Sequence, residues 1–160
     1  MNAPRISITE VRAESDIAAV RELFVEYAAA IGIDLEYQGF SAELASLPGK
    51  YSPPTGELFL ARVGDGAGGC VALRALDQST RELKRLYVRP AARGLGLARR
   101  LVEAAISSAR RQGCAELRLD TLATMVPAQA LYRSFGFVEI PPYGMDRVQG
   151  TRFYGLSLTG

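Results

Sequence analysis

Apolar and polar residues alternate along this chain with two different periods, and the period predicts the local structure. Apolar residues at every second position indicate a strand with one buried face, whereas a spacing of three or four positions indicates a helix that covers a sheet. Glycine and proline mark the ends of these elements. In chain order, the pattern predicts a strand over residues 5–11, a helix from 15 to about 30, a short helix from 41, strands over 58–63, 69–75 and 83–88, a helix from 94 or 95 to 112, a strand over 115–120, a short helix near 127–135, and strands over 137–140 and 152–158.

Two of the predicted helices have a defined apolar face. In the helix that begins at 94 or 95, Leu97, Leu101 and Ile106 share one face, and the arginines lie on the other. In the short helix near 127–135, Leu131 and Phe135 point the same way. We therefore expect both helices to pack on a sheet through these residues.

Composition limits the class of protein. The 160 residues fit one domain, expected over 1–160, and can bury a core. The formal net charge is only +2, so we expect no nucleic-acid partner and no anionic membrane partner. No apolar run reaches the length of a membrane span, and the amino terminus lacks the basic-then-apolar pattern of a signal peptide. We therefore expect a cytoplasmic protein.

Histidine and cysteine usage limits the mechanism. The chain contains no histidine, which excludes serine–histidine and cysteine–histidine catalytic pairs as well as histidine metal sites. Cys70 lies in a predicted strand and Cys114 at the entry to another, without metal-ligand spacing between them. We expect two reduced, packed thiols and no metal site.

The stretch over residues 82–98 combines a strand, a loop with two glycines and the start of a helix. Pro90 ends the strand, and Gly94 and Gly96 allow the backbone to approach a ligand closely. Backbone N–H groups at a helix N-terminus lack intrahelical partners and lie at the positive end of the helix dipole. This junction therefore suits an anion, most simply a phosphate.

Two known phosphate-binding loops do not match this stretch. A Walker loop needs Gly-Lys followed by Ser or Thr, whereas Gly96 is followed by Leu97 and Ala98. A dinucleotide-binding loop needs a third glycine where this chain has Arg99, and it follows its strand more tightly. A dinucleotide-binding protein is therefore disfavoured.

Two motifs resemble the GCN5-related N-acetyltransferase (GNAT) family. Arg-x-x-Gly-x-Ala over residues 93–98 is similar to the family's acetyl-CoA loop, and residues 128–137 match its Ala-x-x-Leu-Tyr-x-x-x-Gly-Phe motif. The motifs lie about thirty residues apart, in the family's order and with the expected strand between them. The resemblance implies an α/β (α+β) GNAT fold, a mixed and mostly antiparallel sheet of about six to seven strands flanked by about four helices.

By this resemblance, acetyl-CoA is the acetyl donor and no metal takes part. Backbone groups of Leu86, Tyr87 and Val88 would pair with the pantetheine amides, and an N–H there could stabilise an oxyanion. Met125 replaces an Asn that many relatives have near the pantetheine arm, so that contact is not expected. A direct phosphate contact and a solvated charge are both open for the Arg93 side chain. The N–H groups that would hold the pyrophosphate belong to Arg93, Gly94, Leu95, Gly96, Leu97 and Ala98.

The resemblance also implies the chemistry, which is acetyl transfer from a thioester to an amine. An ammonium must lose a proton before or during attack, and Glu82 matches a position where some family members have a catalytic glutamate. A water relay as the base, and an ion pair as the role of Glu82, are the alternatives; an apolar setting that raises its pKa would favour catalysis. Tyr132 matches the family's general acid for the departing thiolate, a position that also contacts the cofactor. The alternative is a core tyrosine, which an inward face formed by Leu131 and Phe135 disfavours.

The expected acceptor is a small molecule or amino acid whose primary amine attacks directly in a ternary complex. An acyl-CoA sensor without turnover and an enzyme for a peptide or protein amine stay open, as does the oligomeric state, a homodimer included. The acceptor pocket is expected between the first two helices and the loop after residue 142, with Tyr143 and Arg147 available. Four aromatic residues either line this pocket or cover the core edge, namely Tyr27, Tyr37, Phe40 and Tyr51.

Overall fold

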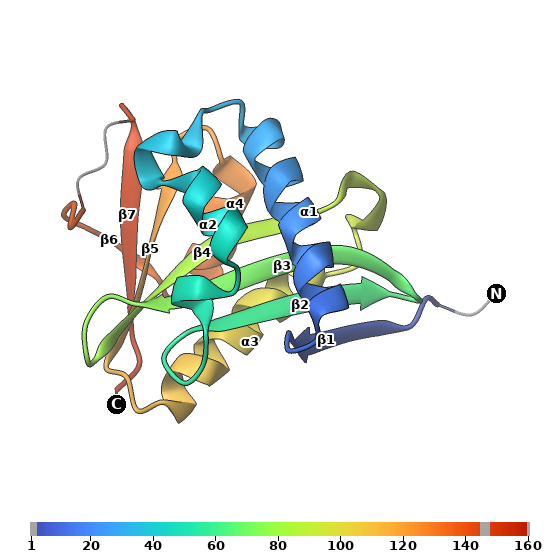
Figure 1. The fold of residues 1–160 in the computed structure, drawn as a ribbon. Coiled ribbons are helices and arrows are strands. Elements are labelled where there is room, and N and C mark those ends of the chain that lie inside the picture. The colour runs from blue at the N-terminus through green and yellow to red at the C-terminus, as the bar shows by residue number, and fades with distance from the viewer. Residues whose placement is uncertain (1–2, 145–147, 160) are drawn as a thin grey trace.

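A computed structural model describes residues 3–144 and 148–159 of the chain. Strands and helices alternate in the predicted order (Figure 1). None of the helices within these residues has the length and apolar character needed to cross a bilayer. In chain order the elements are β1 (Ile6–Glu10), α1 (Glu14–Ile31), the 3₁₀ turn η1 (Leu35–Gln38), α2 (Phe40–Ser46), η2 (Gly49–Tyr51), β2 (Glu57–Val63), β3 (Gly66–Ala75), β4 (Thr80–Val88), η3 (Pro90–Ala92), α3 (Leu97–Arg111), β5 (Glu116–Leu122), α4 (Val126–Ser134), β6 (Val138–Ile140) and β7 (Thr151–Ser157).

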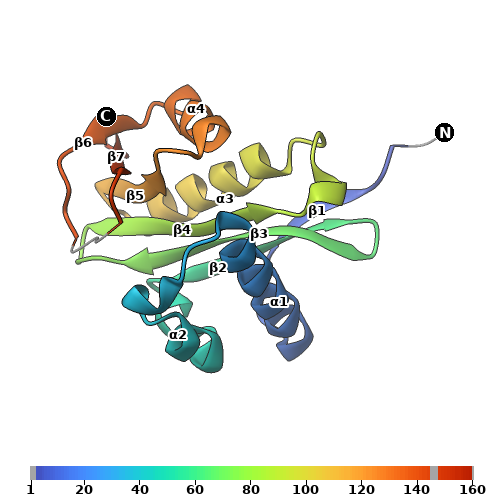
Figure 2. The same cartoon turned by 90° about the horizontal axis from the view of Figure 1, so that it is seen from above.

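The strands of the described residues form one mixed sheet in the order β1-β2-β3-β4-β5-β7-β6. Neighbouring strands are antiparallel, except β4 and β5, which are parallel. Helices α1 and α2 cover one face of the sheet, and α3 and α4 cover the other (Figure 2). The predicted fold class, a mostly antiparallel sheet between layers of helices, is therefore confirmed.

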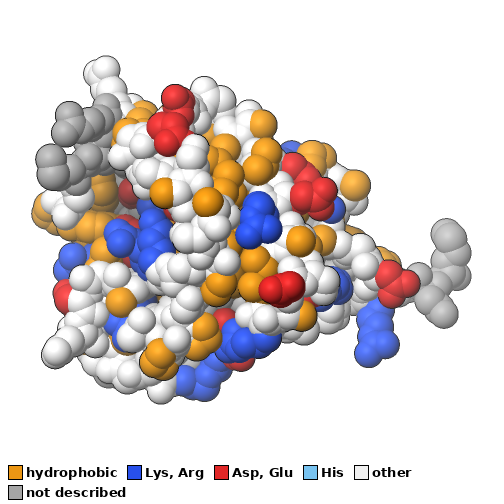
Figure 3. Space-filling view, in the orientation of Figure 1, with side chains coloured by type: hydrophobic (Ala, Val, Ile, Leu, Met, Phe, Trp, Pro, Cys, Tyr) orange, Lys and Arg blue, Asp and Glu red, His pale blue; other side chains and the backbone are white. Residues whose placement is uncertain are grey.

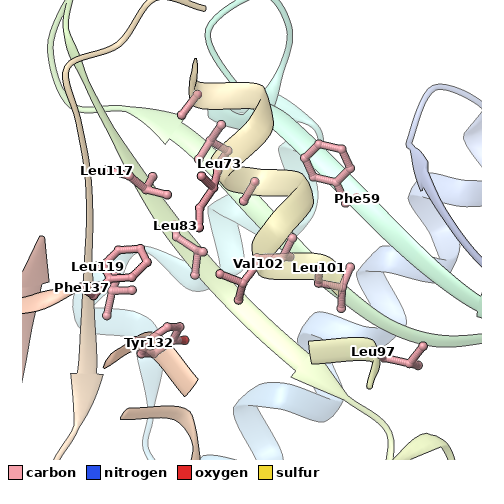
Figure 4. Close-up of a cluster of buried hydrophobic side chains, with 14 of the residues drawn as sticks. Phe59, Leu73, Leu83, Leu97, Leu101, Val102, Leu117, Leu119, Tyr132 and Phe137 are labelled. Atoms are coloured by element: carbon pink, nitrogen blue, oxygen red, sulfur yellow. The ribbon is translucent and has the colours of Figure 1, made fainter. Parts of the chain in front are cut away.

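Each face of the sheet has its own core. On the α3 side, Leu97, Leu101 and Ile106 join a cluster formed with β2, β3, β4 and β5, as the helical spacing predicts (Figure 4). On the α1 side, the rings of Phe24 and Tyr51 pack edge-on with centroids 6.0 Å apart. Because burial of one large apolar side chain stabilises a fold by about 1.5–3 kcal/mol, these two clusters hold both helical layers against the sheet.

Two helix starts differ from the sequence prediction. Helix α3 begins at Leu97 rather than at 94 or 95. Gly94 and Gly96 adopt left-handed φ angles of 83° and 77°, which are incompatible with a right-handed helix. Helix α1 begins at Glu14, one residue before the predicted start at 15. A carboxylate in the first turn is favourable at the positive end of the helix dipole.

Strands β4 and β5 separate after a short parallel pairing. Their pairs run from Thr80–Glu116 to Glu82–Arg118, and none follows among the described residues. Strand β5 continues along β7, while the second half of β4 continues along β3. The backbone of residues 83–88 is therefore not paired with β5.

Strand β4 also carries a β-bulge. The β3–β4 register shifts at this point, and Arg85 has a φ of 61°, which is uncommon for a residue other than glycine. The buried Arg85 side chain donates through Nε and Nη2 to the two carboxylate oxygens of Glu43 on α2, at 3.0 Å each. The rings of Tyr27 and Phe40 lie against its guanidinium. The bulge is thus tied to α2.

Candidate functional site

A large cavity of about 500 Å³ opens where β4 and β5 separate. Leu86, Tyr87 and Val88 form its β4 wall, and Leu122 lies on the β5 side. The remaining lining comes from α1, the loop after β4, and α4 with the turn before it: Tyr27, Ala30, Ile31, Arg93, Ala98, Thr124, Met125, Pro127, Ala128 and Leu131. Five predicted cofactor-binding residues therefore line one cavity, namely Leu86, Tyr87, Val88, Arg93 and Ala98.

The glycine loop lies beside the large cavity, between the lining residues Arg93 and Ala98. The residues between them, 94–97, are not part of the lining. Gly96 is the N-cap of α3, and no side chain caps the first turn. The first N–H groups of α3 therefore keep the hydrogen-bonding capacity that an anion could use.

The large cavity continues into a narrow passage of about 40 Å³. Tyr132 and Asp120 both line this passage. Burial raises the pKa of the Tyr132 hydroxyl, with smaller contributions from Tyr27 and Asp120, so the phenol stays protonated at neutral pH and can donate a proton. The large cavity and the passage share the residues Tyr27, Ile31, Leu86, Leu122 and Met125.

The inward face of α4 is wider than the prediction. Leu131 and Phe135 pack against the core cluster as predicted, although they are only partly buried. Gln129 and Tyr132 are the buried residues of this helix, and the centroid of the Tyr132 ring lies 5.8 Å from that of Phe137. The predicted face is therefore incomplete, because the helix also packs through Tyr132. Tyr132 combines the two alternatives, since it is 5% exposed in the core and also borders the passage.

A polar cavity of about 200 Å³ also adjoins the passage. Tyr143 lines this cavity, as predicted for the acceptor pocket, whereas the predicted Arg147 lies outside the described residues. The passage and the polar cavity share Tyr37, Gln38, Lys84 and Asp120. The polar cavity is completed by Arg74, Leu76, Glu82, Gly144 and Phe153.

Glu82 is 3% exposed, and both of its oxygens have hydrogen-bond donors. Arg74 Nε donates to Oε1 at 2.8 Å, and the Tyr143 hydroxyl donates to Oε2 at 2.6 Å. Lys84 Nζ lies 3.8 Å from Oε1. Burial alone would raise the pKa of Glu82, but the Lys84 charge, the Tyr143 hydrogen bond and Arg74 together lower it. The geometry is that of an ion pair, and the pKa shift has the opposite sign to that expected of a poised base.

Sequence reasoning missed three charged residues around this cavity, Arg74, Lys84 and Asp120. Each follows a leucine within a strand and so fits the solvent-facing half of an apolar–polar alternation. That pattern gives no sign of a shared site, because β3, β4 and β5 contribute one residue each. The available signal was a pair of charged residues, Glu82 and Lys84, at the start of the strand predicted over 83–88.

The four aromatic residues divide between the two predicted roles. Tyr27 and Tyr37 line cavities. Tyr51 is 1% exposed in the α1-side core, and Phe40 packs against the same core. The aromatic group is therefore neither wholly pocket nor wholly core edge.

Both cysteines are buried and unpaired with each other. Burial raises the pKa of the Cys70 thiol, so a reactive thiolate is disfavoured there. Within residues 3–144 and 148–159, no cluster of acidic or thiol side chains is arranged to hold a metal ion.

Comparisons with known proteins agree on one family. A sequence model described as the acetyltransferase (GNAT) family matches residues 17–137. An uncharacterized N-acetyltransferase of Schizosaccharomyces pombe is 41% identical over 99% of both chains. An acetyltransferase of the GNAT family from Staphylococcus aureus superposes with a TM-score of 0.81 at 24% identity, covering 97% of this chain and all of its own. An acetyltransferase from Salmonella typhimurium, solved with its cofactor acetyl-CoA, gives 0.69 at 22% identity, covering 99% and 95%.

Proposed function

Because the chain belongs to the acetyltransferase (GNAT) family, we propose that it transfers the acetyl group of acetyl-CoA to the primary amine of a small molecule or amino acid. The amine attacks the thioester directly while both reactants are bound. The observation that carries this proposal is that the narrow passage shares lining residues with both the large cavity and the polar cavity, so that the three lie in series and form what we call the route.

The route supports a ternary complex because two reactants can approach its centre from opposite ends. The donor enters from the large cavity and the acceptor from the polar cavity, so the thioester and the amine meet near Tyr132 and Asp120. An acetylated cysteine intermediate has little support. Cys70 is fully buried with a raised pKa, and Cys114 is buried.

The donor end suits acetyl-CoA in two respects. The first N–H groups of α3 and the N–H groups of the glycine loop form a concentration of donors for the pyrophosphate. The β4 backbone over residues 86–88 lies on the cavity wall and is not paired with β5, so its polar groups can pair with the pantetheine amides. The Salmonella relative binds acetyl-CoA as its cofactor, which agrees with this assignment.

Tyr132 is the proposed general acid. The Tyr132 phenol is protonated at neutral pH and borders the passage, so it can donate its proton to the sulfur as the thiolate departs. The geometry favours a positioning role for Glu82 over the role of base, because its oxygens already accept hydrogen bonds from Arg74 and Tyr143. The ammonium proton therefore leaves to another carboxylate or to water.

Free thiol released from acetyl-CoA in the presence of a panel of amines tests this function. We expect release with some small amines or amino acids, and initial rates that fit a sequential rather than a ping-pong scheme. A calorimetric titration with coenzyme A, run in parallel, measures cofactor binding separately from turnover.

Three other outcomes would overturn the proposal in different ways. Tight coenzyme A binding without thiol release from any amine would support a sensor. Release only with a peptide or protein amine would move the acceptor to that class. If coenzyme A does not bind and no thiol is released, acetyl-CoA is not the donor of this protein.

A further inference from the structure

Charged side chains of both signs line the polar cavity and the narrow passage. Arg74 lines the polar cavity but not the passage, and its side chain is 32% exposed. Asp120 and Lys84 line both, and Asp120 lies on β5 just beyond the last β4–β5 pair, Glu82–Arg118. An acceptor in the polar cavity therefore meets the Arg74 guanidinium there and the Asp120 carboxylate next to the passage.

The positive charge at the entrance exceeds what Glu82 neutralises. Arg74 and Lys84 both approach this one carboxylate, at 2.8 Å and 3.8 Å. Arg74 uses only Nε for Glu82, and among the described residues Nη1 and Nη2 have no hydrogen-bond acceptor. The outer edge of a guanidinium matches the two oxygens of a carboxylate. Figure 3 shows Lys and Arg side chains gathered between α2 and the β5–β7 side of the sheet.

The negative group at the passage lies where an amine must arrive. Asp120 and Tyr132 line the same narrow passage. The charge of Asp120 also contributes to the raised pKa values of Tyr132, Tyr27 and Tyr143, although burial is the main cause for each. A carboxylate in this position attracts an ammonium and accepts its hydrogen bond.

We propose that the acceptor is an amine that also carries a carboxylate, bound with its ammonium toward Asp120 and its carboxylate on the outer edge of Arg74. This inference rests on the proposed function and narrows its acceptor to amino acids and related zwitterions. Lys84 adds a second positive charge that attracts the acceptor's carboxylate. Its Nζ lies 3.8 Å from Glu82 Oε1 and 3.5 Å from the amide oxygen of Gln38. Glu82 holds both Arg74 and Lys84 in position through these contacts.

Matched acceptor pairs test this inference on the unmodified protein. Each pair consists of an L-amino acid and its primary amide, which keep the same side chain and α-amine but differ in the carboxylate. We expect kcat/KM for the best acid to exceed that for its amide by about tenfold or more, mainly through a lower KM. The amide has the less basic amine and is more readily deprotonated, so amine reactivity works against the expected difference.

Three variants locate the effect. Arg74→Gln should lower kcat/KM for the acid much more than for the amide and so remove most of the preference for the acid, whereas Arg74→Lys should restore part of that preference. Arg62→Gln is the matched control, because Arg62 is 31% exposed, pairs with Asp16 and lies on β2 outside the three cavities. It should keep the full preference. Coenzyme A affinity shows whether each variant is folded.

The outcomes separate this inference from the function on which it rests. Equal kcat/KM for acids and amides in the unmodified protein would overturn the inference and leave acetyl transfer intact. An acid preference that survives in a folded Arg74→Gln variant would also overturn it. If no amine of any kind causes thiol release, the proposed function itself is overturned, and the inference with it.

Discussion

The large cavity and the polar cavity lie at opposite ends of one passage, but they are built from different groups. The large cavity is lined mainly by apolar side chains of α1, β4 and α4, and the glycine loop lies beside it. The polar cavity is formed by charged and hydroxyl side chains from η1, β3, β4 and β5 and from the segment around Tyr143. The donor end should therefore be more sensitive to backbone changes, and the acceptor end to side-chain changes.

The junction of the two ends should show the largest effect. Tyr132→Phe removes the phenol proton at the narrow passage, and we expect kcat to fall by about 10²–10⁴-fold while coenzyme A affinity changes little. The thiol-release assay and calorimetry measure these two quantities separately. Tyr154→Phe is the control, because Tyr154 is 1% exposed in the same core but lines none of the three cavities. Unchanged kcat in Tyr132→Phe would remove this residue from the chemistry.

The buried Glu43–Arg85 ion pair, which ties the β4 bulge to α2, should show the next largest effect, and this effect is on the free energy of unfolding. Glu43→Gln leaves the buried Arg85 guanidinium without its carboxylate, and we expect the free energy of unfolding to fall by about 3 kcal/mol. Urea denaturation measures the change. Glu103→Gln, on the exposed side of α3, should change it by less than about 0.5 kcal/mol. Equal stability of the two variants would show that the bulge does not depend on its tie to α2.

The same pair predicts a pH dependence. Burial alone would raise the pKa of Glu43, but the hydrogen bonds and charge of Arg85, together with Lys50, lower it. A lowered carboxyl pKa stabilises the fold above the usual value near about 4.3, and this contribution is lost as pH falls through the lowered pKa. The stability difference between the unmodified protein and Glu43→Gln should therefore be constant between about pH 6 and 8 and shrink below about pH 4.

The two ends also differ in how far the sequence predicts them. At the proposed donor end, one contiguous loop with Gly94 and Gly96 sets the backbone geometry, so a short motif is sufficient to predict that geometry. At the acceptor end, Arg74, Lys84 and Asp120 are brought together only by the sheet order and by the separation of β4 from β5. Local periodicity predicts the strands that contain them but not the residues across the gap.

Two further features escape local sequence reasoning for the same physical reason. The inward face of α4 depends on how that helix packs on the sheet, and this packing buries Tyr132 in preference to Leu131. The left-handed backbone at Arg85 is compensated by Glu43 from another layer, a contact between residues far apart in the chain. Neither feature has a local signal.

Glu82→Gln tests the side-chain character of the acceptor end. The uncharged glutamine side chain no longer holds the Arg74 guanidinium and the Lys84 ammonium in position, so we expect KM for the acceptor to rise about tenfold with a smaller change in kcat. Glu57→Gln is the matched control, because Glu57 is also buried and paired with an arginine, Arg12, but lies outside the three cavities. A fall in kcat of about 100-fold at unchanged KM would instead support Glu82 as the general base.

Gly96→Ala tests the backbone character of the donor end. A Cβ at this position meets no atom within 4 Å, so its cost comes from the φ of 77° alone. In the unbound Gly96→Ala variant, the exposed loop relaxes away from this φ, and coenzyme A binding must restore it. Restoring it costs about 1 kcal/mol, which weakens coenzyme A affinity about fivefold. Gly113→Ala is the matched control, with the same φ and the same open space beyond the far end of α3. It should affect stability but not affinity.

Arg93→Gln should show the smallest effect, because it changes a side chain at the end built from backbone. Arg93 is exposed beside the loop, and an exposed charge near a phosphate contributes about 0.3–1 kcal/mol at low salt. Coenzyme A affinity should therefore fall by only about two- to fivefold, and less at high salt. Arg110→Gln, in the last turn of α3, should leave the affinity unchanged. A loss for Arg93→Gln greater than that for Gly96→Ala would reverse the order and make the donor end a side-chain site.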